Sequence, residues 1–236
     1  MIFLDRSDAG RRLARQLVAR DLGGDVVVLG LACAGVVVAY EVARELAAAL
    51  DVLVVRRLYG PRVPRLAVGA VAEGGHVFID PERVRQLGSD RDAVPEIVAR
   101  EQRTVEHWAL RCRSGSPRAP LEGRRVVIVD DGAAFGHRAR AAIESARALG
   151  AGSVVVAVPV MASPALEELR RAADEVVYLD EPSLFISVGY WYARCGPVSD
   201  EEVSTILERA RLERRGWIAA PPGRGSRREE HPDQHA

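Results

Sequence analysis

Residues 126–138 read Val-Val-Ile-Val-Asp-Asp-Gly-Ala-Ala-Phe-Gly-His-Arg, and this stretch decides the fold. The apolar run predicts a buried strand over 126–129, and a helix is expected over 137–149 after a short loop. Ligands of open parallel sheets bind at the carboxyl ends of strands. Asp130 and Asp131 follow the strand directly, so the sequence predicts a binding site at this strand end.

The loop between the two acids and the helix has the chemistry of an anion cradle. Gly132 and Gly136 bound it and permit a close approach of the backbone to a ligand. The first amides of a helix have no intrahelical acceptor and lie at its positive dipole end. Carboxylates accept hydrogen bonds from vicinal hydroxyls or coordinate a divalent metal. Together these groups suit a sugar phosphate.

Strand and helix patterns alternate along the chain around this motif. Further strands are expected over 26–30, 52–55, 154–159 and 175–179, and helices over 7–20, 36–50, 92–113, from 163, and after the capping box of residues 199–202. The expected fold class is therefore α/β, a doubly wound, mostly parallel sheet.

One segment, 57–115, breaks the alternation and is expected to be an insertion. It begins with an exposed loop over 57–65 and continues with a hairpin of strands at 67–72 and 76–79. Residues 1–218 are expected to form one domain, and 219–236 a disordered C-terminal tail without apolar periodicity.

Composition excludes several function classes. All 33 basic residues are arginine, so Schiff-base chemistry and a P-loop lysine are absent. The formal net charge is zero and no basic block stands out, so no nucleic-acid partner is expected. Three scattered cysteines, no apolar run of membrane-spanning length and no signal-peptide pattern predict a cytoplasmic protein without a membrane partner.

The stretch 129–138 resembles the phosphoribosyl-pyrophosphate (PRPP) motif of type I phosphoribosyltransferases. One bacterial branch of that family reads Val-Asp-Asp-Gly-Ile-Ala-Thr-Gly-Ala-Thr. The identical positions after the valine are Asp130, Asp131, Gly132, Ala134 and Gly136, whereas Phe135 and Arg138 stand in place of threonines. Segments 26–39, 51–58, 66–75, 189–192 and 199–203 are similar to other parts of the branch, so the resemblance covers about residues 3–210.

The resemblance implies roles for these residues. Asp130 and Asp131 would bind the ribose 2′- and 3′-hydroxyls during catalysis, and the loop from Gly132 through Ala133, Ala134, Phe135 and Gly136 to His137 and Arg138 would bind the 5′-phosphate. Cys33, Ala34 and Gly35 would form the pyrophosphate loop, with Arg56 and Arg57 facing the diphosphate. Mg²⁺ would be held through the bound ligand, with no direct protein ligand. Segment 57–115 would form a flexible loop or hood over the sheet edge.

Several of these residues have alternative interpretations. Phe135 either plugs the phosphate cradle or turns outward, and Arg138 either grips a phosphate or faces solvent. His137 is expected as an exposed helix start rather than a base. Cys33 is expected to be a small buried thiol. Further along the chain, Tyr59 and Glu73 are candidates for the mouth, and Trp191 either covers a nucleobase site or packs in the core.

Two functions are compatible with this pattern. The first is a phosphoribosyltransferase that transfers phosphoribose from PRPP to a nitrogen acceptor. The second is a regulatory module of the same fold that binds PRPP or a nucleotide, favoured by the loss of an arginine, a glycine and two hydroxyls from the loops. A hydrolase that uses Cys33 lacks an identifiable base. The pattern leaves a homodimer open.

Overall fold

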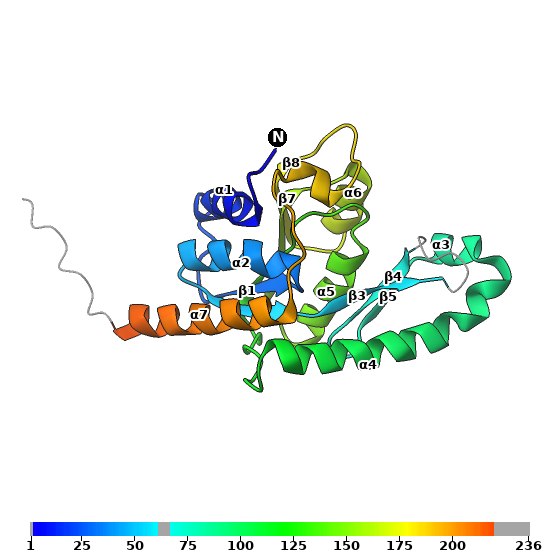
Figure 1. The fold of residues 1–236 in the computed structure, drawn as a ribbon, viewed down its shortest axis with the longest axis horizontal. Helices are drawn as coiled ribbons and strands as arrows, with labels where there is room; N and C mark the ends of the chain where they lie inside the picture. The colour runs from blue at the N-terminus through cyan, green and yellow to red at the C-terminus, as the bar shows by residue number, and fades with distance from the viewer. Residues whose placement is uncertain (1, 61–66, 220–236) are drawn as a thin grey trace, which may run out of the picture.

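The computed structural model describes residues 2–60 and 67–219. Five parallel strands form the main sheet in the order β2-β1-β6-β7-β8 (Figure 1). Their bounds are β1 Val26–Leu31, β2 Ala49–Leu53, β6 Arg125–Val129, β7 Ser153–Val160 and β8 Glu175–Asp180. This topology confirms the expected α/β class with a mostly parallel sheet.

Helices cover both faces of the main sheet, and alternate strand residues explain why. Val28 and Val127 pack in the cluster that includes α1, Arg6–Val18, and α2, Ala34–Glu45. Val27 and Ile128 point the other way, into the cluster that includes helical residues of α5 and α6. The bounds of these two helices are α5 His137–Ala148 and α6 Ser163–Arg170. Neighbouring residues of a strand face opposite sides, so a strand that is apolar throughout must be covered on both faces.

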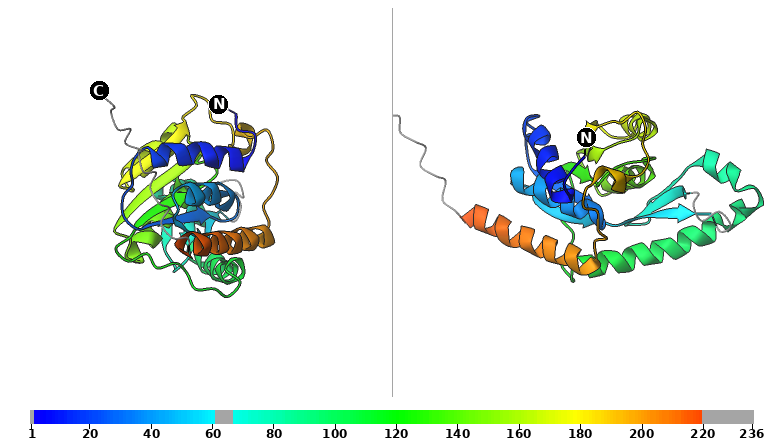
Figure 2. Two further views of the ribbon diagram at one scale, coloured as in Figure 1. Left: turned by 90° about the vertical axis from the view of Figure 1, so that its left-hand side faces the viewer. Right: turned by 45° about the horizontal axis from the view of Figure 1, so that its top comes forward.

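The insertion is a small antiparallel sheet with its own helices, which we call the hood. Strands β3 Val55–Tyr59, β4 Ala67–Ala72 and β5 Val77–Ile79 pair in that order. Helix α3 Pro81–Gln86, a 3₁₀ turn at Gly88–Ala93 and the long α4 Val94–Cys112 complete it. Figure 2 shows the hood extending away from the main sheet as an arm.

Two boundary predictions, one at the end of α2 and one at the start of the hood, are wrong. The helix expected over 36–50 ends at Glu45, because Ala47 takes a left-handed φ of 50° and the amide of Ala48 turns back to the carbonyl of Ala43. The strand β2 therefore starts at Ala49. The loop expected from Arg57 is instead strand β3 as far as Tyr59.

The C-terminal helix starts as the sequence predicts. In the capping box, the amide of Glu202 donates to Ser199 Oγ at 3.2 Å and the amide of Ser199 donates to Glu202 Oε2 at 2.9 Å. Helix α7 spans Asp200–Ala219 and so includes the first residue of the tail expected over 219–236, whereas residues 220–236 lie outside the described part. No helix in the described residues is long and apolar enough to span a membrane.

Candidate functional site

The loops after β1 and β6 meet at the carboxyl edge of the main sheet. Gly30 pairs with Val129 at the ends of these two strands. A Cβ on Gly35 would lie 2.7 Å from the Val129 carbonyl oxygen and 3.0 Å from Asp130 Cα, so only glycine lets the start of α2 pack against the end of β6. The family resemblance implies this juxtaposition, because it assigns both loops to one ligand.

Asp130 and Asp131 are both buried at the end of β6, and each faces an arginine. Asp130 Oδ2 lies 3.3 Å from Arg138 Nη1, and Asp131 Oδ2 accepts a hydrogen bond of 3.0 Å from Arg6 Nε. The Tyr192 hydroxyl donates to the main-chain oxygen of Asp131 at 2.5 Å and fixes the backbone there. Two adjacent carboxylates repel one another, and the two guanidinium groups relieve this repulsion.

Burial dominates the ionisation of Asp130. Removal from water raises its pKa to about 7, although Arg138 opposes the shift. The amide of Asp131 donates to Asp130 Oδ1 at 2.9 Å and favours the ionised form as well. Asp130 is therefore poised to change its charge near neutral pH, when a ligand, a cation or a proton reaches it.

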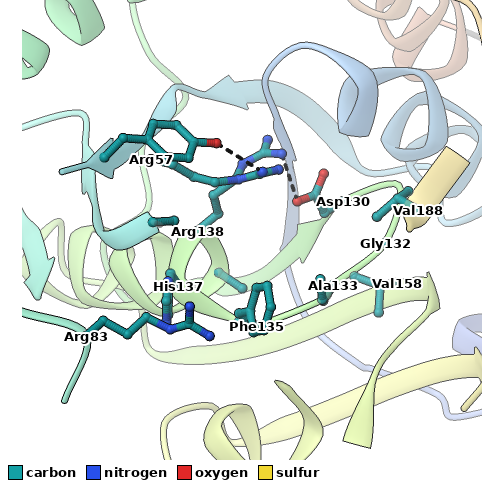
Figure 3. A pocket seen from close by; sticks show the side chains of 15 residues that line it. Arg57, Arg83, Asp130, Gly132, Ala133, Phe135, His137, Arg138, Val158 and Val188 are labelled. Atoms are coloured by element: carbon teal, nitrogen blue, oxygen red, sulfur yellow. Dashed lines mark hydrogen bonds and ion pairs between the residues drawn. The ribbon is translucent and has the colours of Figure 1, made fainter. Parts of the chain in front are cut away.

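A pocket of about 210 Å³ opens beside Asp130 (Figure 3). Its wall includes the loop after β6, the start of α5, and side chains of the hood. The lining residues are Arg57, Tyr59, Ala67, Arg83, Asp130, Gly132, Ala133, Ala134, Phe135, Gly136, His137, Arg138, Ala139, Val158 and Val188. Three arginines and one carboxylate thus line the pocket, which favours an anionic ligand.

The backbone of the loop is shaped for an anion. Gly136 is the N-cap of α5, has a left-handed φ of 76° and supplies no side-chain cap. The first amides of α5 are consequently left to solvent or to a bound group. A Cβ on Gly132 would lie 3.0 Å from side-chain atoms of Val160 and Val188, so a larger residue there would have to displace these two valines.

Phe135 turns outward rather than plugging the cradle. Its side chain is about half exposed, the Arg83 guanidinium carbon lies 4.4 Å from its ring centroid, and the His137 ring stacks on it at 6.1 Å. Figure 3 shows Phe135 and Arg83 side by side. Phe135 therefore leaves the pocket open while its half-exposed ring forms part of the lining, which favours the outward alternative.

His137 is buried, so the expectation of an exposed helix start is wrong. Its Nε2 lies 3.2 Å from Asp80 Oδ2, and Asp80 also caps helix α3 of the hood. Burial lowers the pKa of His137, so the neutral ring donates this hydrogen bond. The residue thereby joins the hood to the loop, and it also forms part of the pocket lining.

The remaining basic residues divide between pocket and scaffold. Arg138 lines the pocket, and its Nη2 also donates to the Ala32 carbonyl at 2.9 Å. Arg57 lines the pocket too and donates to the Tyr59 hydroxyl at 3.3 Å. Arg56 instead pairs with Glu101 at 2.6 Å and lies over the Trp108 ring, so it points away from the site.

Cys33 and Ala34 lie at the start of α2, outside the lining of this pocket, as does Gly35. The peptide bond between Ala32 and Cys33 is cis. Cys33 Sγ lies 3.9 Å from Asp200 Oδ1, and burial together with this carboxylate raises the pKa of the thiol. A protonated thiol is a weak nucleophile, so this environment disfavours the hydrolase interpretation.

Two residues expected near the site lie elsewhere in the structure. Glu73 is buried in an ion pair with Arg113, outside the pocket lining, whereas Tyr59 does line the pocket. Trp191 packs in the core beside Phe185, which is the second of its two alternatives.

Sequence reasoning missed Arg6, Arg83 and Asp80. Asp80 and Arg83 could have been predicted from the sequence. Asp80 followed by Pro81 is a helix-start signal, and it places Arg83 in the first turn of α3. Arg6 is 125 residues from its partner Asp131, and no local pattern connects the two.

Metal binding by protein groups alone does not fit the described residues. They contain no group of three or more histidine, cysteine, aspartate or glutamate side chains that could hold an ion. Asp130 is the single carboxylate among the residues that line the pocket. A divalent ion at this edge would therefore need most of its oxygen ligands from a bound phosphate compound and water.

Comparisons with known proteins agree with this geometry. The family model of the phosphoribosyl transferase domain matches residues 4–191. Two curated proteins from strains of Mycobacterium tuberculosis, each named "Putative phosphoribosyl transferase", are 46% identical over 209 residues, which is 89% of this chain and 47% of theirs. The chain thus spans about half the length of the curated relatives it matches. The solved structure of TT1426 from Thermus thermophilus is 42% identical, with a TM-score of 0.74 over 89% of this chain and 99% of that one.

Proposed function

The chain belongs to the phosphoribosyl transferase domain family, and on this premise we propose that it binds PRPP or a related ribose 5-phosphate compound with Mg²⁺ in the pocket beside Asp130. The observation that carries the proposal is the placement of two buried acids and an uncapped, glycine-led helix start on one loop. Acceptors for hydroxyls and donors for a phosphate are thereby brought together at one strand end.

Each part of the ligand has a partner in this arrangement. The 5′-phosphate would lie against the first amides of α5, where the helix dipole and Arg138 favour negative charge. The ribose hydroxyls would donate to Asp130 and Asp131, in the roles that the family resemblance implies. Arg57 and Arg83 of the hood would face the remaining negative charge.

Mg²⁺ would neutralise the diphosphate when bound with it. In a transfer reaction, the bond from C1 of the ribose to pyrophosphate breaks and a bond to the acceptor nitrogen forms. Positive charge develops on the ribose as the bond breaks, and the ionised carboxylates of Asp130 and Asp131 would stabilise it. Arginines at the pocket rim would stabilise the departing anion.

A regulatory binding module is the second candidate, and two observations favour it. Both acids already pair with arginines, Asp131 with Arg6 and Asp130 with Arg138. A ligand must displace these arginines or share the carboxylates with them. The two carboxylates are then less available to stabilise the positive charge that develops on the ribose. The loop at Cys33 and Ala34 also supplies no cation for a pyrophosphate. Binding without turnover would fit this arrangement.

The test is calorimetric titration with PRPP and Mg²⁺, followed by an assay for released pyrophosphate with amine and nucleobase acceptors. Asp130→Asn with Asp131→Asn should weaken binding at least tenfold, which corresponds to about 1.4 kcal/mol. A matched control, Asp21→Asn with Glu208→Gln, removes the same charge from exposed positions and should bind as the parent does. Equal affinity in the double Asp variant would contradict the site. Binding without pyrophosphate release would select the regulatory module.

A further inference from the structure

A second basic cavity lies at the opposite end of the main sheet from the candidate site. It is about 250 Å³ in volume and opens between the start of β2, the loop before β6, and helix α7. Four arginines line it: Arg118, Arg124, Arg211 and Arg214. We call this cavity the arginine pocket.

The positive charge of the arginine pocket is only partly compensated. Arg118 lies 3.4 Å from Glu73, which Arg113 already binds, and Arg124 pairs with Asp25. Arg211 donates to the neutral Ser116 hydroxyl at 2.7 Å. Within the described residues, Arg214 has no hydrogen-bonding or ionic partner.

The single carboxylate in the wall of the arginine pocket does not neutralise these cations. Asp51 is buried, and its two oxygens are occupied by Arg113 Nε at 3.0 Å and by the amide of Ala119 at 2.7 Å. At least two guanidinium groups, those of Arg211 and Arg214, therefore remain without a counter-charge among the described residues. They lie one turn apart on α7 and repel each other unless an anion joins them.

The wall also contains a donor without an acceptor. Arg124 Nε is buried and makes no hydrogen bond within the part of the chain that the structure describes, although the Nη atoms of the same side chain donate to Pro120 and Asp25. Buried donors are ordinarily paired, so an unpaired one indicates a missing partner. Ala49, Leu50 and Pro117 supply apolar wall, which lowers the local dielectric and strengthens any ion pair formed inside.

From this arrangement we propose that the arginine pocket binds a small phosphate-bearing anion, at a site separate from the ribose phosphate site. Guanidinium groups bind phosphate oxygens in pairs of parallel hydrogen bonds, and forks from α7 and from the loop before β6 face a cavity of the right size. Two uncompensated cations match a ligand with two or more negative charges. Free pyrophosphate and a nucleoside diphosphate share this chemistry.

The experiment is calorimetric titration of the full chain with inorganic pyrophosphate, without Mg²⁺. Arg211→Gln with Arg214→Gln should weaken binding at least tenfold. Arg15→Gln with Arg103→Gln removes the same charge from exposed positions on α1 and α4 and should leave binding unchanged. Arg138→Gln, which alters the candidate site, should also retain binding in the arginine pocket.

The opposite pattern would overturn the inference. Loss of binding in Arg138→Gln with full binding in the α7 double variant would place pyrophosphate only at the candidate site, and the proposed function would still stand. Arg214→Gln alone removes a side chain that has no partner among the described residues, so it tests the site even if the double variant folds poorly, and it should weaken binding at least threefold. Titration with ADP then separates the two sources: equal affinity indicates a nucleoside diphosphate, and weaker binding indicates free pyrophosphate.

Discussion

At the scale of single residues, the ionisation of Asp130 gives a direct prediction. Its ordinary pKa of 3.8 rises to about 7 in the folded protein, because burial disfavours the charged form. Between these two values, the folded protein holds a proton that the unfolded chain has released. The contribution of Asp130 to the free energy of unfolding is therefore fully present below pH 3.8, and it is lost as the pH rises through about 7.

Asp130→Asn removes this titration, so the difference in unfolding free energy between the parent and the variant should depend on pH. The parent should lose at least about 1 kcal/mol relative to Asp130→Asn between about pH 5 and pH 8, because one unit of pKa shift corresponds to about 1.4 kcal/mol. Urea unfolding of both proteins across this range measures the difference. Parallel profiles would show that Asp130 is already ionised in the folded protein at about pH 5.

The residue scale also shows which parts of the site are local. The acids, Gly132 and Gly136 are placed by a strand and a helix that adjoin them in sequence, so a short stretch predicts their position. Arg6 and Arg83 arrive from distant elements, and only the packing of α1 and the hood brings them close. The partners of a site are for this reason harder to predict than its motif.

At the scale of elements, a buried ion network fastens the hood to the main sheet. Arg113 at the end of α4 donates to Asp51 of β2 at 3.0 Å, to Glu73 after β4 at 2.7 Å, and to the Val52 carbonyl at 2.6 Å. All three charged side chains are buried. Such a network favours one placement of three elements, because each partner is costly to leave alone.

Arg113→Ala should lower the free energy of unfolding by about 3–5 kcal/mol, because it leaves the buried carboxylate of Asp51 without a cation and that of Glu73 with Arg118 alone. Arg103→Ala, at an exposed position on the same helix, should change it by less than about 0.5 kcal/mol. Urea unfolding measures both. A loss below about 1 kcal/mol in Arg113→Ala would mean that water or a shifted Arg118 replaces the guanidinium.

Most elements of the fold could be predicted from the sequence, and the failures have local causes. The main strands are identified by runs of consecutive apolar residues, because a strand that is apolar at every position is buried on both faces. The end of α2 was missed because Ala47, rather than glycine or asparagine, adopts the left-handed conformation that ends it. The strand β3 was missed because arginines and a following proline-rich stretch resemble a loop, whereas pairing with β4 decides the structure.

At the scale of the whole molecule, the distribution of charge along the sequence differs from its distribution in the folded structure. The chain is neutral overall and has no basic block, yet it gathers arginines at both ends of the main sheet. Those of the arginine pocket come from 118–124 and 211–214, which are far apart along the chain. A scan for charge runs cannot detect such a cluster, because folding creates it.

The extent of the domain gives the last prediction. The buried apolar core of the described residues ends at Leu207, and α7 contributes Val203 and Leu207, both fully buried. A chain that ends at Ala219 keeps all of this core and should melt within a few degrees of the full chain. A chain that ends at Val198 loses two buried aliphatic side chains, worth about 1.5–3 kcal/mol each, and should melt ~10 °C lower or more.

Thermal unfolding of the three chains measures these midpoints. Equal midpoints for both truncations would mean that α7 contributes little to the core. A large loss on removing only residues 220–236 would mean that they pack on the domain, against the absence of apolar periodicity in their sequence.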